Sequence, residues 1–269
     1  IEFLTRLRYL RGITCYGMSE YDDAVEELTF VVDWAPNHFG GFFMRGKALW
    51  KSDEFNRSLE DLNETIRLNP NHYEAYEIRS KIQLCLEEYD LALVDLSSAI
   101  NGGIQNPSIF LARASLWIMR GDMQNAAADI HDAIRLAPDD AELHKALGSL
   151  RAIQGDTGNA ITDLNRSIRL NPNDSAAFRF RGALRFVQWD LEKACTDFTE
   201  AVRLNPEDAD AYRLLGMTHL ILGDFESAVS AFTERIRLKS SDSDAFQLRA
   251  DAWEALEEDF ESAAPQKQD

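Results

Sequence analysis

The chain has 269 residues and a formal net charge of −18, with 45% hydrophobic and 28% charged residues. This composition can form a buried core, and no apolar run approaches the roughly 18 to 20 residues that cross a bilayer. The negative charge argues against binding to nucleic acid, whose affinity for proteins comes from Lys and Arg releasing counterions, and against anionic membranes. Proteins are the partners that remain.

One pattern returns every 34 residues. Prolines follow this spacing at Pro36, Pro70, Pro138, Pro172 and Pro206. A first column of small residues consists of Gly12, Gly46, Ser80, Ala114, Gly148, Gly182, Gly216 and Ala250. A second column consists of Ala24, Ser58, Ala92, Ala126, Ala160, Ala194, Ala228 and Ser262. A period of this length indicates an array of repeats, each one a supersecondary unit.

Each repeat predicts two helices of about 14 residues with a tight turn between them, because the apolar residues recur at helical spacing. In one copy, Gly223 and Asp224 form this turn. An acid precedes the second helix, where it suits the positive end of the helix dipole and, as Asp, can cap free N–H groups. These acids are Glu20, Glu54, Glu88, Asp122, Asp156, Asp190 and Asp224. The prolines end the second helix.

Antiparallel packing of the two helices is expected to place Gly182 near Ala194 and to let the helix axes approach closely. Phe178 and Phe198 are expected to fill the space between successive hairpins. Because one hairpin cannot bury its apolar face alone, the hairpins must stack.

A recurring arginine precedes the first small column, and an acid recurs sixteen positions later. The arginines are Arg11, Arg45, Arg79, Arg113, Arg181 and Arg249. The acids are Glu27, Asp61, Asp95, Asp129, Asp163 and Asp197. This spacing predicts ion pairs within each hairpin, interpreted as partly solvent-exposed pairs of small energetic value. Leu215 and Ala231 replace both partners in one repeat, whereas Leu147 faces a retained Asp163.

These columns resemble the signature of the tetratricopeptide repeat family, shown in full by Phe178, Gly182, Ala194, Phe198, Ala201 and Pro206. The resemblance implies an all-α fold, a right-handed α-solenoid superhelix of antiparallel helix pairs. It covers residues 1–257 as one array. The repeats lie near 5–38, 39–72, 73–106, 107–140, 141–174, 175–208 and 209–242, with a final helix over 243–257. The polar residues 258–269 are expected to fray or to form a linker.

No active site is predicted from the sequence. The five histidines occupy unrelated repeat positions, and no histidine, cysteine or acid spacing suggests a metal or a cofactor. His144 and His219 are interpreted as core histidines. The three cysteines, Cys15, Cys85 and Cys195, form no disulfide framework, which favours a reducing, cytoplasmic compartment. With no histidine near them in the sequence, they lack an activating base.

The resemblance further implies that the first helices line a concave groove, which holds a peptide or a partner's helix. The groove residues carried over are Tyr9, Phe43, Lys47, Trp50, Lys81, Lys145, Arg179, Phe186 and Arg213. The groove is aromatic toward the N-terminal half and carries several cations. It would suit a segment with an apolar anchor and some carboxylates.

The sequence therefore predicts a non-enzymatic protein-interaction scaffold or adaptor without a cofactor. The alternative is a regulatory or substrate-docking arm of a larger enzyme whose catalytic domain lies outside this sequence. The chain begins without Met, so a fragment is expected. Self-association through the ends of the array is a third hypothesis.

Overall fold

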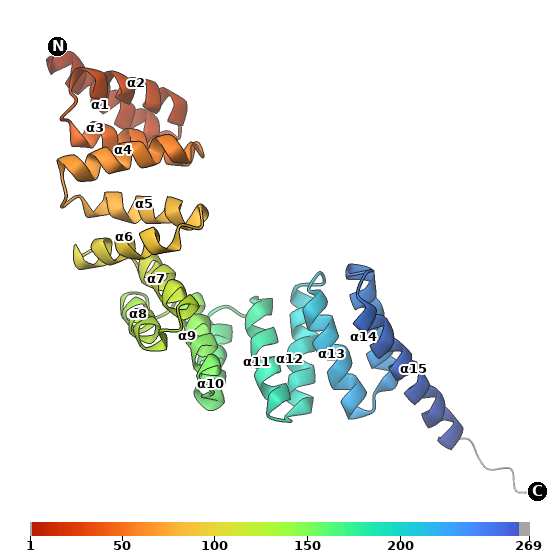
Figure 1. Ribbon diagram of the computed structural model, residues 1–269. Helices are drawn as coiled ribbons and strands as arrows, with labels where there is room; N and C mark the ends of the chain where they lie inside the picture. The colour runs from red at the N-terminus through yellow and green to blue at the C-terminus, as the bar shows by residue number, and fades with distance from the viewer. Residues whose placement is uncertain (1, 264–269) are drawn as a thin grey trace, which may run out of the picture. The chain divides into compact units, whose positions relative to one another are not determined.

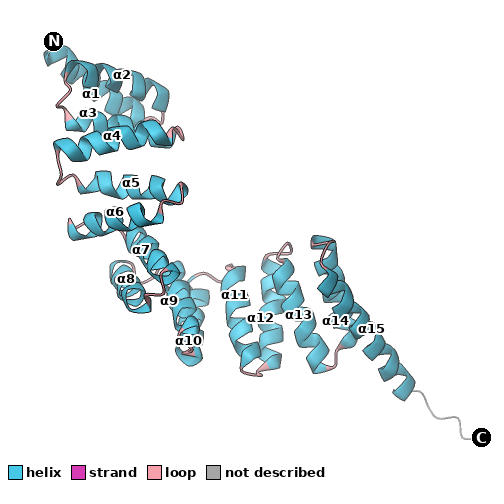
Figure 2. Ribbon diagram, in the orientation of Figure 1, coloured by secondary structure: helices cyan, strands magenta, loops and turns pink. Residues whose placement is uncertain are grey.

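A computed structural model describes residues 2–263, which form fifteen α-helices and no strand (Figure 2). Two compact units divide the chain, the first ending at Leu136 and the second beginning at Ala137. The first unit contains α1 Glu2–Gly17, α2 Tyr21–Trp34, α3 Phe39–Lys51, α4 Phe55–Leu68, α5 Tyr73–Cys85, α6 Tyr89–Asn101, α7 Pro107–Met119 and α8 Met123–Leu136. The second contains α9 Ala141–Ile153, α10 Thr157–Leu170, α11 Ser175–Val187, α12 Leu191–Leu204, α13 Ala209–Leu222, α14 Phe225–Leu238 and α15 Ser243–Ala263.

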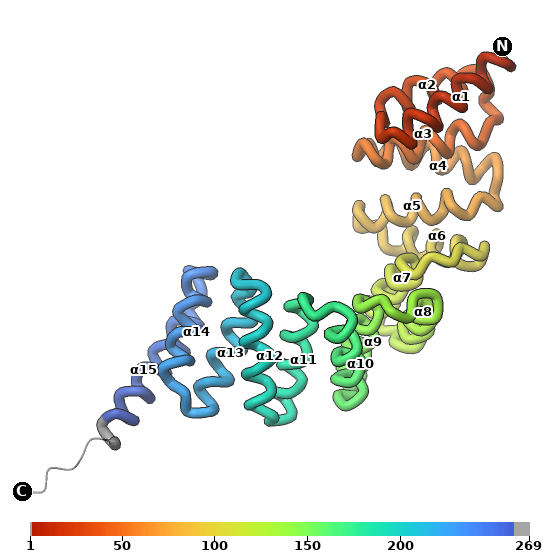
Figure 3. Tube along the Cα trace, turned by 180° about the vertical axis from the view of Figure 1, so that it is seen from behind, coloured from red at the N-terminus to blue at the C-terminus, as the bar shows by residue number. Residues whose placement is uncertain are grey.

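Within each unit, consecutive helices form antiparallel pairs, and each pair packs against the next (Figures 1 and 3). The all-α solenoid of helix pairs predicted from the 34-residue period is confirmed. The final helix α15 continues past the expected end at residue 257 to Ala263. The remainder of the expected polar tail, residues 264–269, lies outside the described residues.

The turn between the two helices of a hairpin is tight, and the residue after it begins a new helix. The expected capping by Asp is found at three positions: the carboxylates of Asp122, Asp156 and Asp224 accept hydrogen bonds from backbone N–H groups of the first helical turn. Asp190 instead pairs with Lys193 at 2.7 Å. The glutamates at this position make no capping hydrogen bond, because their longer side chain suits capping less well than that of Asp.

The two small columns meet in the hairpins of Gly46 and Gly148, where an added Cβ would lie 3.4 Å from the Ser58 carbonyl oxygen and 3.1 Å from the Ala160 carbonyl oxygen. The expected contact of Gly182 with Ala194 stays a prediction. The Ser58 hydroxyl donates a 2.7 Å hydrogen bond to the Gly46 carbonyl, and the second small column is fully buried from Ala24 to Ala228. A Cβ added at Gly182 would lie 2.8 Å from Cε1 of Phe198. Glycine is therefore required here by the close approach of an aromatic ring.

Only one of the two aromatic residues expected between hairpins is part of the core. Phe198 is fully buried and packs with Leu215 of the next hairpin. Phe178 is only half-buried, and the Arg181 guanidinium lies 5.3 Å from the centre of its ring. The expected position of Phe178 between successive hairpins stays a prediction.

The predicted arginine–acid pairs form within the hairpins, and their carboxylates are buried. Arg45 donates two hydrogen bonds to Asp61, at 2.8 and 2.7 Å. The same two-point contact joins Arg79 to Asp95, Arg113 to Asp129 and Arg181 to Asp197. These four aspartates are only 1% to 4% exposed. The arginines stay partly open to solvent, as expected, with 14% to 19% of each side chain exposed. Two-point contacts to a carboxylate are the strong class of charged hydrogen bond, and the small energetic value expected of these pairs stays a prediction.

The same arginines also hold successive hairpins together. The Arg79 guanidinium donates to the Asn63 side chain at 2.6 Å, and Arg181 donates to Asn165 at 2.7 Å. Both acceptors lie on the second helix of the preceding hairpin. The exception at Leu147 is also explained, because Arg151, one turn later, pairs with Asp163 at 2.6 Å.

Candidate functional site

Three of the predicted groove residues come together in one cleft of the first unit. Lys47, Trp50 and Lys81 line a cavity of about 490 Å³ between the first helices α1, α3 and α5. The other residues around it are Tyr16, Lys51, Glu74, Glu77, Ile78, Ile104, Gln105 and Asn106. We call this cavity the lysine–tryptophan cleft.

Cations lie over aromatic rings throughout the lysine–tryptophan cleft. The Lys47 Nζ atom is 5.1 Å from the centre of the Tyr16 ring, and the Lys51 Nζ atom is 4.4 Å from the Trp50 ring. The Lys81 Nζ atom lies 5.7 Å from the Trp50 ring. Cation–π contacts of this length stabilise an exposed site by about 0.5–1 kcal/mol each. The aromatic rings therefore hold the ammonium groups in place around the cavity.

The lysines of the cleft differ in their carboxylate partners. Lys81 is paired with Glu77 at 2.8 Å, and Glu77 also accepts a hydrogen bond from the Asn106 amide at 2.7 Å. Among the described residues, no carboxylate forms an ion pair with Lys47 or Lys51. Two positive charges are thus available to an external anionic group beside the Trp50 and Tyr16 rings.

The predicted cations of the second unit have a different environment. Lys145 pairs with Glu142 at 2.7 Å and with Asp174 at 2.8 Å. Burial alone would lower the pKa of Lys145, but the hydrogen bonds to Asp174 and Glu142 outweigh it and raise the pKa. Arg179 pairs with Asp208 at 2.9 Å. Both charges are balanced inside the unit, where they connect the first helix of one hairpin to the start of the next.

This connection was missed in the sequence although its signal is periodic. Lys145–Asp174, Arg179–Asp208 and Glu77–Asn106 are all contacts between one residue and the residue 29 positions later. The partner precedes the first helix of the next repeat. A search for complementary residues at this spacing would have found it.

Arg213 and Phe186, the two other groove residues predicted in the second unit, do not join a charged site. The Arg213 guanidinium lies 3.7 Å from the Met217 sulfur. Phe186 packs against the core around Phe198.

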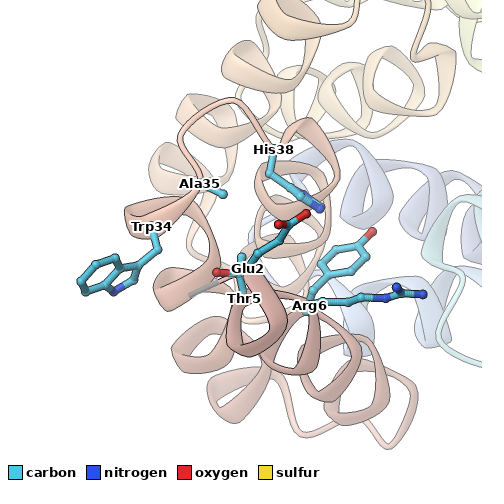
Figure 4. Close-up of a pocket in the computed structure, with 7 residues that line it drawn as sticks. Glu2, Thr5, Arg6, Trp34, Ala35 and His38 are labelled. Carbon is cyan, nitrogen blue, oxygen red and sulfur yellow. The ribbon is translucent and has the colours of Figure 1, made fainter.

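Tyr9 and Phe43 form aromatic contacts in the first unit at the same repeat position. The Tyr9 ring lies 4.7 Å from the His38 ring, and the Phe43 ring lies 4.2 Å from the His72 ring. Tyr9 and His38 also line a cavity of about 670 Å³ at the start of the unit, together with Glu2, Thr5, Arg6, Trp34 and Ala35. In Figure 4 the Trp34 ring points away from Glu2 and His38. His38 itself caps α3, because its Nδ1 atom accepts the Gly41 N–H at 2.8 Å.

The structure corrects one expectation about the cysteines. Cys195 Sγ lies 3.5 Å from Nε2 of His219, and His219 Nδ1 lies 3.0 Å from Asp224 Oδ2. The histidine comes from the next hairpin, so sequence distance concealed it. Burial raises the pKa of the Cys195 thiol, and Cys195 is the fifth residue of α12.

Residues 2–263 contain no cluster of three or more His, Cys, Asp or Glu residues suited to a metal ion. His144 is buried, as expected, with Nε2 2.9 Å from the Pro138 carbonyl oxygen. None of the described helices has both the length and the apolar character that a bilayer crossing requires.

Comparison with known proteins defines the class of protein. The sequence profile of the tetratricopeptide repeat matches residues 43–102, 111–175 and 181–243. The chain belongs to the tetratricopeptide repeat (TPR) family. A comparison with curated proteins finds no significant match.

Solved structures share this fold at low sequence identity. The C-terminal part of a TPR repeat-containing protein from Cytophaga hutchinsonii matches with a TM-score of 0.72 and 14% identity, over 89% of this chain and 98% of that one. YrrB, a TPR protein with an unusual peptide-binding site, matches with a TM-score of 0.63 and 19% identity, over 70% of this chain and 96% of YrrB. A chain of the APC/C hetero-tetramer Cut9–Hcn1 matches with a TM-score of 0.63 and 15% identity, over 91% of this chain but 48% of that chain.

Proposed function

We propose that this protein is an interaction scaffold that binds a segment of a partner protein at the lysine–tryptophan cleft of the first unit. The observation that carries the proposal is the pair of ammonium groups, on Lys47 and Lys51, that lie over aromatic rings without a carboxylate partner among the described residues. The neighbouring Lys81, in contrast, forms an ion pair with Glu77.

The chemistry of the cleft favours a segment that combines a carboxylate with an apolar anchor. A carboxylate would pair with Lys47 or Lys51, and an apolar side chain would pack on the Trp50 and Tyr16 rings. Aromatic and cationic residues of this kind dominate the energetics of protein interfaces. Two structurally similar proteins support the class of function: YrrB has a peptide-binding site, and Cut9–Hcn1 is a hetero-tetramer.

Binding of synthetic peptides to the full chain tests this proposal. The peptides would contain one Leu or Phe flanked by Asp or Glu, and isothermal titration would measure the affinity. Lys47→Glu should weaken binding at least tenfold, because it replaces an attraction with a repulsion, and Trp50→Ala should weaken it similarly.

The matched control is Lys193→Glu, which makes the same charge change at an exposed lysine of the second unit that does not line the cleft. Equal losses for Lys47→Glu and Lys193→Glu would reduce the effect to net charge and contradict the proposed site. Binding that is unchanged in Lys47→Glu would contradict it directly.

A further inference from the structure

A second surface, in the second unit, is built around a tryptophan in an unusual backbone conformation. The turn of every complete hairpin contains one residue with positive φ at the same repeat position. These residues are Ser19, Asp53, Glu87, Gly121, Gly155, Trp189 and Gly223. Glycine adopts this conformation freely, whereas a bulky side chain such as that of Trp189, at φ 61°, is an outlier.

The Trp189 side chain is not held in the core. It is 73% exposed, as is Val187 two residues earlier, and Ile221 at the same repeat position as Val187 is 44% exposed. Together with Phe186 and Leu191, these side chains surround a cavity of about 140 Å³. This volume is well below the roughly 300–1,000 Å³ of small-molecule pockets, so the cavity suits one inserted side chain.

An exposed apolar residue recurs at this repeat position in the second unit. Ile153 has the repeat position of Val187 and Ile221 and is 59% exposed. In the first unit this position is occupied by Gly17, Lys51, Cys85 and Met119. A contiguous exposed apolar patch on a protein surface marks an interaction site, and an exposed tryptophan is a frequent anchor residue in interfaces.

The charge around this patch identifies the occupant. Glu192 and Glu226 flank the cavity in sequence, are exposed, and form no ion pair with the described residues. Asp224 follows the Gly223 turn beside Ile221 and is also exposed. Lys193, the nearest lysine in sequence, is paired with Asp190 at 2.7 Å. The acids that follow the cavity-lining residues Leu191 and Ile221 in sequence are therefore exposed and negatively charged.

We propose that Trp189, Val187 and Ile221 form a docking site for a protein segment that inserts one aliphatic side chain flanked by basic residues. The aliphatic group fills the cavity, and Lys or Arg side chains pair with Glu192 and Glu226. This surface is independent of the lysine–tryptophan cleft, which has the opposite charge preference.

Fluorine NMR of the full chain labelled with 5-fluorotryptophan tests this proposal. The protein has five tryptophans, and the Trp189 signal is identified by its loss in Trp189→Gly. The probe is a short synthetic peptide with one Leu flanked by Lys residues. The Trp189 signal should shift and saturate, Glu192→Gln with Glu226→Gln should weaken binding at least fivefold, and Lys47→Glu should leave the shift unchanged.

Two matched comparisons protect the test from a folding artefact. Trp189→Gly should keep the helical circular dichroism and at least the wild-type melting temperature, because glycine suits positive φ, while binding of the peptide is lost. Glu87→Gly changes the equivalent turn residue in the first unit and should leave peptide binding intact. No Trp189 shift, or an equal shift with a Glu-flanked peptide, would overturn the proposal. A Trp189 shift that depends on protein concentration alone would also overturn it, since the occupant would then be a second copy.

Discussion

The two units share one repeat pattern but use the same groove position differently. In the first unit, Tyr9 and Phe43 stack on His38 and His72. In the second, the equivalent residues Lys145 and Arg179 form ion pairs across the same repeat interval. Both arrangements connect one hairpin to the next. The difference shows that a cation predicted to line a groove can belong to the internal structure of the array.

This comparison also distinguishes lysines and arginines that are paired with a carboxylate from those that are not. Where aromatic rings make the connection between hairpins, Lys47 remains free of a carboxylate partner among the described residues. Where charged residues make the connection, the positive charges of Lys145 and Arg179 are balanced inside the unit. Among the described residues, Lys47 of the first unit and Arg213 of the second form no ion pair, and Lys47 lies in the lysine–tryptophan cleft.

The largest expected effect concerns the buried arginine pairs. Arg45→Met should reduce the free energy of unfolding by about 3 kcal/mol, because it leaves the buried Asp61 carboxylate without its arginine. Arg181→Met should cost less, since Asp197 keeps a 2.8 Å contact with Arg185. Denaturation in guanidinium chloride, followed by circular dichroism, measures both. Equal losses for the two variants would show that Arg185 does not stabilise the Asp197 carboxylate.

Arg67→Met provides the control for this series, because it removes an exposed pair with Glu64 at the helix surface. Its loss should be much smaller than that of Arg45→Met, because an exposed ion pair contributes little to stability. A double-mutant cycle on Arg45 and Asp61 should give a clearly favourable coupling energy, and a coupling of zero would contradict the assignment of the pair as a structural contact.

The glycine column should respond according to the space in each hairpin. Gly182→Ala should destabilise the protein by about 2 kcal/mol through overpacking, because the added Cβ would lie 2.8 Å from the Phe198 ring. Gly46→Ala should cost less, since its nearest contact would be 3.2 Å from Asp61 Cβ. Thermal unfolding measures the melting temperatures of the two variants. A lower melting temperature for Gly46→Ala than for Gly182→Ala would contradict the packing argument.

Replacing one lysine in each unit tests the groove comparison directly. Lys145→Met should lower the stability by about 1 kcal/mol, the upper range for a partly exposed pair, because Asp174 loses its partner. Lys47→Met should change stability by less than about 0.5 kcal/mol. Chemical denaturation measures the free energy of unfolding of both variants. A larger loss for Lys47→Met would assign that lysine a structural role.

Acidification should weaken the second unit more than the first. The pKa of Asp156 is lowered by hydrogen bonds from Asn159, and the pKa of Asp224 is also lowered, because hydrogen bonds with Ser227 and the nearby His219 outweigh burial. A carboxyl with a lowered pKa in the folded state stabilises the fold above its unfolded pKa of about 3.9. This stabilisation is lost as the pH falls through the folded pKa.

In the first unit, Asp122 is the turn residue with the same lowered pKa, whereas Glu20, Glu54 and Glu88 form no capping hydrogen bond. Hydrogen exchange of the full chain between about pH 5 and 3, around the ordinary carboxyl pKa, should therefore show earlier loss of protection in α10 and α14 than in α4. Uniform loss across both units would contradict this expectation.

The amino-acid sequence by itself determined the helix pairs and the columns of small residues inside the hairpins. These features are local or strictly periodic, so spacing along the chain sets them: the small residue at Gly46 meets Ser58 because a short turn joins their helices. The arginine–aspartate pairs followed from the same reasoning.

Only the tertiary structure decided which charged groups remain available for binding. Whether Lys145 is free depends on Asp174, which lies one hairpin further along, and the contact of Cys195 with His219 also joins two hairpins. The burial of Asp61 and the exposure of Trp189 depend on which helices cover them. The free energy of an ion pair depends on its desolvation and on all its neighbours, and those neighbours are set by stacking between repeats rather than by the spacing within one.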